Sequence, residues 1–123
     1  MEDFTPGPHL LIDHRGGAGL TDTTRLEDAM RAAANAAGAE VLSVTLHVLP
    51  DDAGVTGAAL LTEGHIAVRT WVEQGYSSFD VFIPGDGRGK MAADSLARTL
   101  LPDWTQIKAY PRNDFTPPPV AMS

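Results

Sequence analysis

The sequence contains no cysteine among its 123 residues. Disulfides, thiolate metal ligands and a cysteine nucleophile are therefore excluded. Aromatic residues make up only 7% of the chain and hydrophobic residues 43%, a balance typical of a globular protein. Because a chain of this length can bury a core without cross-links, we expect a single domain.

Positive charge is also scarce. Nine Lys and Arg residues against sixteen Asp and Glu residues give a formal net charge of −7. Nucleic acids and anionic membranes are recognised through basic surfaces, so we expect neither as a partner. No apolar run reaches the roughly 18 residues of a membrane span, and the first residues lack the basic and apolar regions of a signal peptide. We therefore expect a cytoplasmic protein.

Local patterns predict two helices and six strands. One helix should follow Thr24, which forms a capping box with Glu27, and should end at Gly38. A second helix is predicted over residues 91–101. Strands are predicted at residues 9–13, 41–49, 58–61, 65–70, 76–83 and 105–110.

This order of elements favours an α+β fold: a two-layer α/β sandwich, with both helices on one face of an antiparallel sheet. The other face of the sheet needs a cover, which a homodimer can supply. We expect residues 1–110 to form the domain. Residues 111–123 hold four prolines and are expected to be a flexible tail.

Three ordered segments carry the functional signal: a Gly54-Val55-Thr56-Gly57 turn, the stretch from Thr62 to Glu73, and the stretch from Gly75 to Asp86. Together they resemble the small bacterial and archaeal S-adenosylmethionine (AdoMet) decarboxylases. That family has a Gly-Val-Ser-Gly turn, a Ser-Glu-Ser-His hairpin followed by His-Thr-Trp-Pro-Glu, and a Gly-Tyr strand ending in Phe-Thr-Cys-Gly. The resemblance covers about residues 7–110 and implies the family's fold, AdoMet as ligand and a place in spermidine biosynthesis.

The resemblance also implies a specific chemistry, from which this sequence departs. In the family, a hairpin serine attacks the preceding carbonyl, the chain is cut, and a pyruvoyl group forms that accepts electrons during loss of CO₂. Gly64 matches that serine and has no hydroxyl. Arg69 matches the processing histidine and Pro84 the proton-donating cysteine, and neither can do that work. Thr56 keeps a hydroxyl at the second processing position. We therefore expect no self-processing and no pyruvoyl cofactor.

Other positions keep the family's residue types. Glu73 matches the glutamate that holds the ribose hydroxyls, and Glu63 precedes the cleavage position. We expect Glu73, Glu63, Thr56 and Arg69 to bind ligand, with Glu63 and His65 as candidate catalytic residues. Arg69 can either pair with Glu63 or Glu73 or bind a ligand carboxylate, and the ion pair is favoured.

Two further features of the sequence bear on the chemistry. Thr62 is a second hydroxyl in the hairpin, and its attack on the Leu61 carbonyl would leave a 2-oxobutyryl group, which an intact-mass measurement would detect. The four histidines are far apart in the sequence and lack metal-ligand spacing. We therefore expect isolated imidazoles and no metal site.

Three functions remain open. The favoured one is a non-processing AdoMet-decarboxylase-like protein that binds AdoMet or an analogue, or forms a heterodimer with an active homologue and regulates it. The second is another AdoMet lyase or hydrolase that uses Glu63 or Glu73, with His65, as the base. The third is a protein simply classed with the AdoMet decarboxylases, or an active member in which a native serine at position 64 has been replaced.

Overall fold

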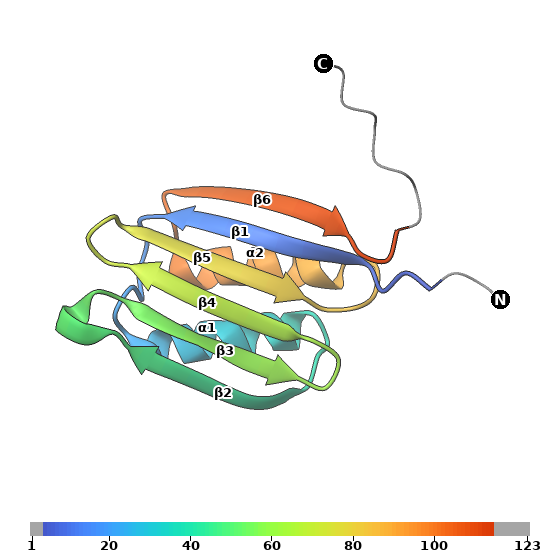
Figure 1. The fold of residues 1–123 in the computed structure, drawn as a ribbon, viewed down its shortest axis with the longest axis horizontal. Helices are drawn as coiled ribbons and strands as arrows, with labels where there is room; N and C mark the ends of the chain where they lie inside the picture. The colour runs from blue at the N-terminus through green and yellow to red at the C-terminus, as the bar shows by residue number, and fades with distance from the viewer. Residues whose placement is uncertain (1–3, 115–123) are drawn as a thin grey trace, which may run out of the picture.

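The computed structural model describes residues 4–114, and its elements follow the predicted order (Figure 1). A short 3₁₀ turn, Pro50–Asp52, lies between the second and third strands. The remaining elements are β1 (Pro8–Arg15), α1 (Thr23–Ala36), β2 (Val41–Val48), β3 (Val55–Leu61), β4 (His65–Trp71), β5 (Tyr76–Phe82), α2 (Arg88–Leu100) and β6 (Trp104–Pro111).

The strands form one six-stranded sheet in the order β2-β3-β4-β5-β1-β6, with all neighbours antiparallel. β2 to β5 follow one another as hairpins, whereas β1 lies between β5 and β6. The chain therefore crosses from the β1 side of the sheet through α1 to the opposite edge at β2. Both helices cover the same face (Figure 1), so the predicted fold class is confirmed.

The core lies between the sheet and the helices. Along the central strands alternate residues face the helices, and Leu10, Ile12, Phe79 and Val81 are buried there. Burying an apolar side chain of this size contributes roughly 1.5–3 kcal/mol. The two helices also contact each other. Both carry small buried residues, which include Ala29, Ala33, Ala92 and Ala93.

Both helices begin earlier than the sequence predicted. The capping box at Thr24 is wrong, because the N-cap of α1 is Asp22, whose carboxylate accepts the Arg25 backbone N–H at 3.0 Å. α2 begins at Arg88, and Met91 is 56% exposed. The face of α2 that meets the core is formed instead by smaller residues and two leucines: Gly89, Ala92, Ala93, Ser95, Leu96 and Leu100.

The end of the chain agrees only in part with the predicted division. β6 extends to Pro111, one residue into the predicted tail, while residues 115–123 of that tail lie outside the described residues. Among residues 4–114, neither helix is long and apolar enough to span a membrane.

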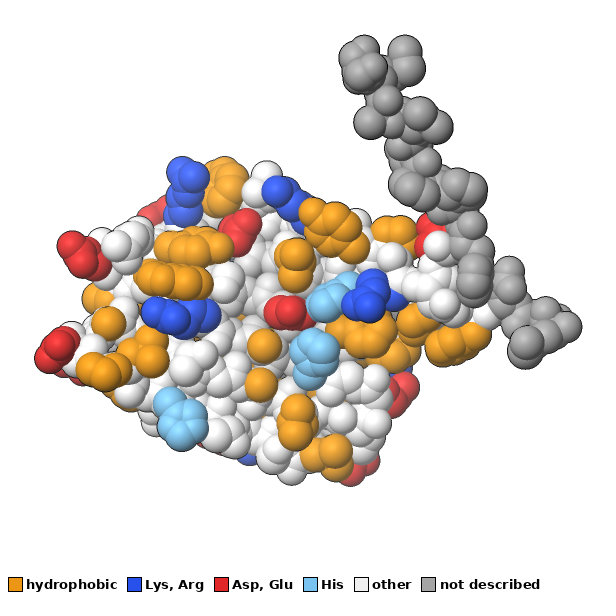
Figure 2. All heavy atoms as spheres, in the orientation of Figure 1, with side chains coloured by type: hydrophobic (Ala, Val, Ile, Leu, Met, Phe, Trp, Pro, Cys, Tyr) orange, Lys and Arg blue, Asp and Glu red, His pale blue; other side chains and the backbone are white. Residues whose placement is uncertain are grey.

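The second face of the sheet carries no helix of this chain. The other set of alternating residues lies there, and Figure 2 shows this face as a mixture of hydrophobic, acidic, basic and histidine side chains. In β1 this set is His9, Leu11, Asp13 and Arg15, which alternate with the core residues. The term "open face" is used below for this side of the sheet.

Candidate functional site

A hollow of about 490 Å³ lies on the open face, across five of the six strands. β1, β5 and β4 form its floor, and β3 and β6 contribute its sides. Polar residues from each of these strands line it: Asp13, Thr56, Arg69, Tyr76, Ser78, Asp80, Lys108 and Tyr110. The hollow therefore combines both signs of charge with hydroxyl groups.

The basic groups of the hollow lie on strands some distance apart in the sheet. Arg69, on β4, pairs with Thr56 of β3, and its guanidinium lies 4.5 Å from the centre of the Trp71 ring. Its Nε donates to the Thr70 carbonyl at 3.3 Å. Lys108 is on β6, directly opposite Leu11 of β1. Stacking on Trp71 orients the Arg69 guanidinium, which leaves its terminal nitrogens available to an anionic group.

The acidic groups of the hollow come from β1 and β5. The Tyr76 hydroxyl donates to Asp13 at 2.5 Å. Burial, with a smaller effect from Asp13, raises the pKa of Tyr76 to about 12. Tyr76 also stacks on Trp71, with ring centres 4.9 Å apart and planes 24° from parallel. Asp13 is thus a carboxylate in a fixed position, held by a phenol that stays protonated at neutral pH.

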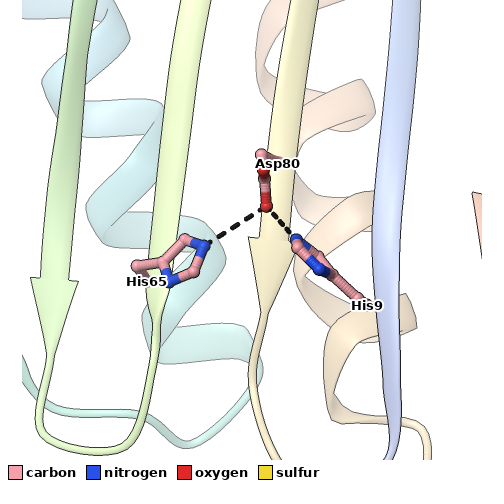
Figure 3. Close-up of side chains that lie close together, drawn as sticks. All are labelled: His9, His65 and Asp80. Atoms are coloured by element: carbon pink, nitrogen blue, oxygen red, sulfur yellow. Dashed lines mark hydrogen bonds and ion pairs between the residues drawn. The ribbon is translucent and has the colours of Figure 1, made fainter. Parts of the chain in front are cut away.

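Asp80, the second acid, contacts two histidines (Figure 3). Its Oδ1 atom contacts Nε2 of His9 and lies 3.3 Å from Nε2 of His65. The two imidazole rings meet edge to face, with centres 5.9 Å apart. The prediction of isolated imidazoles is therefore wrong for these two histidines. Both pair in register with Phe82 of β5, which brings them together from opposite sides.

Glu63, predicted as a ligand-binding and catalytic residue, lies away from the hollow at the turn between β3 and β4. Its carboxylate forms two contacts with Arg88, at 3.0 and 3.2 Å. A hydrogen bond from Arg88, reinforced by its charge, lowers the pKa of Glu63. The favoured ion pair of Arg69 with Glu63 or Glu73 is therefore wrong: Glu63 faces Arg88 near the helix ends, and no ion pair of Arg69 occurs among the described residues.

Arg88 is a residue that sequence reasoning missed. A guanidinium has five N–H donors, and Arg88 uses all of them. Two contact Glu63, and the others donate to the carbonyls of Ala37 at 2.8 Å, Gly38 at 3.1 Å and Pro84 at 2.9 Å. Arg88 therefore joins the C-terminal end of α1, the β3–β4 turn and the loop after β5. Apart from Pro84, these partners are 25 to 51 residues away in the sequence, so no local pattern indicates them.

The three positions where the sequence departs from the resemblance do not lie together. Gly64 precedes β4, and a Cβ atom there would lie 1.9 Å from the Phe82 carbonyl oxygen and near Ile83. Pro84, just beyond, offers its carbonyl to Arg88. Arg69 is five residues along β4, about 17 Å away at the spacing of a strand. The hairpin end, where Glu63 and Pro84 contact Arg88, is therefore separate from the hollow on the open face.

The remaining predicted residues are divided between these regions. Thr56 and Arg69 both line the hollow, where they are paired neighbours. His65 belongs to the cluster with Asp80. Glu73 is exposed at the turn between β4 and β5 and is not among the residues that line the hollow. Its predicted contact with ribose hydroxyls stays a prediction.

The structure is thus an α/β sandwich with a polar hollow on its uncovered sheet face. A solved structure, the adenosylmethionine decarboxylase from Aquifex aeolicus, has the same fold: the TM-score is 0.79 over 95% of this chain and 98% of that chain, at 22% identity. A sequence model of the S-adenosylmethionine decarboxylase family matches residues 8–113. The chain belongs to this family, as the resemblance implied.

Two relatives of known name belong to the same family. An S-adenosylmethionine decarboxylase proenzyme from Caldanaerobacter subterraneus is 40% identical over 82 residues, and one from Prochlorococcus marinus is 44% identical over 85 residues. In both comparisons the match covers 65% of this chain and 65% of the relative. The matched region therefore spans slightly less than two thirds of each relative's length.

The prediction that the protein carries no cofactor is wrong. The relatives are named proenzymes, a form that precedes maturation, and the family's cofactor is a pyruvoyl group. The prediction rested on the missing hydroxyl at Gly64 and on the replaced residues at Arg69 and Pro84. That absence excludes an acyl shift at one peptide bond, but it does not decide the chemistry of the whole chain. Position 64 itself does not fit the group, because a side chain there would collide with the Phe82 carbonyl.

Proposed function

We propose that this protein binds AdoMet in the hollow of its open face and acts within the polyamine-forming role of its family. The observation that carries this proposal is the arrangement of charges. AdoMet combines a carboxylate with two cationic groups, an ammonium and a sulfonium. The hollow offers Arg69 and Lys108 on one hand and Asp13 and Asp80 on the other.

The geometry suggests which part of AdoMet each of these side chains contacts. The Arg69 guanidinium, held against Trp71, suits the ligand carboxylate through its planar pair of donors. Asp13, held by Tyr76, suits a cationic group. The net charge of −7 further favours a ligand that carries net positive charge, because the surrounding potential is negative.

Decarboxylation is the reaction that the relatives' names support first. Its test is the release of CO₂ from carboxyl-labelled AdoMet by the full chain, together with the intact mass of the same sample. Two fragments would show that the chain matures, and their masses would give the peptide bond that breaks, including one at Thr62. Failure to bind AdoMet or decarboxylated AdoMet at millimolar concentration would contradict the proposal.

A second candidate is a member that binds AdoMet and modulates an active homologue. The observation that favours it is Gly64, which has neither a hydroxyl nor room for one. Its test is to add this protein to an active AdoMet decarboxylase and to measure CO₂ release. A change in the rate supports this candidate, and an unchanged rate with no co-elution removes it. The homodimer predicted from the open face stays a prediction, which light scattering tests.

A further inference from the structure

Three side chains on the open face present nitrogen and oxygen atoms to a single point (Figure 3). They are His9 of β1, His65 of β4 and Asp80 of β5, and their ligand atoms all lie within 4.8 Å of one another. The strands neighbour each other in the sheet, in the order β4-β5-β1. We propose that this cluster binds a divalent transition-metal ion, Zn²⁺ in the first instance.

The donor set fits this class of ion. Imidazole nitrogens and a carboxylate are the ligands of Zn²⁺, Co²⁺ and Ni²⁺, whereas Mg²⁺ and Ca²⁺ prefer oxygen alone. A tetrahedral Zn²⁺ places its ligand atoms about 3.3 Å apart. The separation of 3.3 Å between His65 Nε2 and Asp80 Oδ1 already matches this value, and the closer His9 contact needs only a small opening.

The backbone fixes the three side chains before any ion binds. Phe82 is the register partner of both His9 and His65, and its ring lies 5.4 Å from the first and 6.2 Å from the second. Asp80 is two residues earlier on the same strand and so faces the same side. The apolar ring of Phe82 therefore lies beside both imidazoles.

The cluster of His9, His65 and Asp80 is also accessible from solvent, so an exchangeable ligand can reach a bound ion. The side chains of His9, His65 and Asp80 are 19%, 38% and 41% exposed, so they are partly covered yet reachable from solvent. Three protein ligands leave a fourth position, as in zinc sites that bind water or a substrate. Asp80 also lines the hollow, so that position adjoins it.

Arg112 forms a contact with His9 that competes with metal binding. Its Nη1 lies 3.2 Å from Nδ1 of His9, and because a guanidinium can only donate, Nδ1 must accept. The proton of a neutral His9 is then on Nε2, where it bonds to Asp80. An ion at Nε2 requires that proton to move to Nδ1, which breaks the Arg112 contact. Removing Arg112 should therefore leave metal binding as strong or make it stronger.

The experiment uses the untagged full chain, freed of metal by chelation and dialysis, and needs no AdoMet. Zn²⁺ is titrated by calorimetry and Co²⁺ by absorption. We expect one equivalent of Zn²⁺ and an intense four-coordinate Co²⁺ spectrum. His65→Gln and Asp80→Asn should each lower the affinity by at least about 100-fold, since losing a ligand exceeds the 10–100-fold effect of an outer contact.

Two matched variants make the result decisive. His47→Gln changes a histidine on β2 that pairs with Thr56 on the same open face but lies outside the cluster, so it should leave the affinity unchanged. Arg112→Ala should not weaken binding. His9→Gln serves as a second ligand variant if either of the first two fails to fold. Binding below one equivalent, or an equal loss in His47→Gln, would overturn the proposal. Because AdoMet is absent, this result is independent of the proposed function.

Discussion

Arg88 and Glu63 face each other through two parallel contacts of 3.0 and 3.2 Å, and this pair connects the β3–β4 turn to the start of α2. Arg88 also donates to the carbonyls of Ala37 and Gly38, directly after α1, where a positive charge is favourable. Glu63, which the sequence suggested as a ligand contact, therefore has a structural partner in Arg88. Other residues line the hollow on the open face.

Replacing Arg88 should lower stability more than replacing Glu63. Arg88→Ala loses all five hydrogen bonds and should lower the melting temperature by several degrees, whereas Glu63→Gln keeps the carbonyls capped and should cost less than half as much. Arg88→Lys should resemble the alanine variant, because an ammonium cannot span these partners. Thermal unfolding followed by circular dichroism measures the order. Equal effects of Glu63→Gln and Arg88→Ala would contradict the capping role.

The same pair implies a dependence on pH. The pKa of Glu63 is lowered in the folded state, so its contribution to stability is present at neutral pH and is lost as the pH falls through that lowered pKa. The difference in melting temperature between wild type and Glu63→Gln should therefore shrink in acid. A difference that stays constant down to pH 3 would argue against the ion pair.

Gly64 should not tolerate a side chain in this conformation. A Cβ atom at position 64 would lie 1.9 Å from a backbone oxygen, so Gly64→Ala should cost about 1–3 kcal/mol, as overpacking does. Gly75→Ala is the control, because no atom lies within 4 Å of its Cβ position and only its φ of +59° opposes the change. Urea unfolding compares the two. A neutral Gly64→Ala would mean that the hairpin turn adapts at no cost.

His14 should make the protein less stable in mild acid. It is buried beside Phe79, its Nε2 has no hydrogen-bond partner among the described residues, and burial lowers its pKa despite the opposing effect of Asp13. The unfolded chain then binds the proton more readily, so stability falls as the pH drops below about 6.5. The total loss is roughly 1.4 kcal/mol for each unit by which the pKa of His14 is lower in the folded than in the unfolded chain.

Urea unfolding between pH 5 and pH 8 tests this effect, with His14→Phe as the comparison. The variant removes the titrating group and the unpaired nitrogen, and it should flatten the profile in this range. His47→Gln is the control, since His47 is exposed. If the wild type and His14→Phe lose stability in parallel as the pH falls, His14 is not the cause.

Tyr76 should produce a second loss of stability, in base. Its pKa is about 12 in the folded protein against 10.0 in its ordinary range, so its contribution is present below pH 10 and is lost as the pH rises towards 12. Because the ring is partly exposed, Tyr76→Phe should cost only about 1 kcal/mol at neutral pH. The absorbance of tyrosinate, compared between wild type and this variant, measures the pKa. A Tyr76 that ionises near pH 10 would contradict both the burial of its hydroxyl and the hydrogen bond to Asp13.

The order of elements could be predicted from the sequence because each has a local pattern. α1 shows the helical repeat of Leu26, Met30 and Ala33, all of which are buried as that repeat requires. The helix starts were less accurate, because both Asp22 and Thr24 are good caps and only the path of the preceding chain decides between them. The start of α2 at Arg88, three residues before the predicted start at Met91, likewise has no distinctive local signal.

The site could be predicted only in part. Arg69 and Thr56 were identified through the resemblance, and both line the hollow. The joining of His9 with His65 was not predictable, since it depends on β1 inserting between β5 and β6 and on a register that no local pattern fixes. The partners of Arg88 are equally nonlocal. These contacts arise from tertiary structure, so sequence spacing does not indicate them.

The most direct test of the proposed function is a calorimetric titration of AdoMet into the wild-type chain and into Arg69→Ala. Losing a charge-assisted contact of about 1.5–3 kcal/mol should weaken binding roughly 10- to 100-fold. Arg98→Ala is the matched control, because Arg98 is exposed on α2, on the opposite side of the sheet, and its loss should not alter the affinity. Saturable binding by wild type and Arg98→Ala with a loss in Arg69→Ala is the predicted result. Equal affinity in all three proteins, or no binding by wild type, would contradict an AdoMet site in the hollow of the open face.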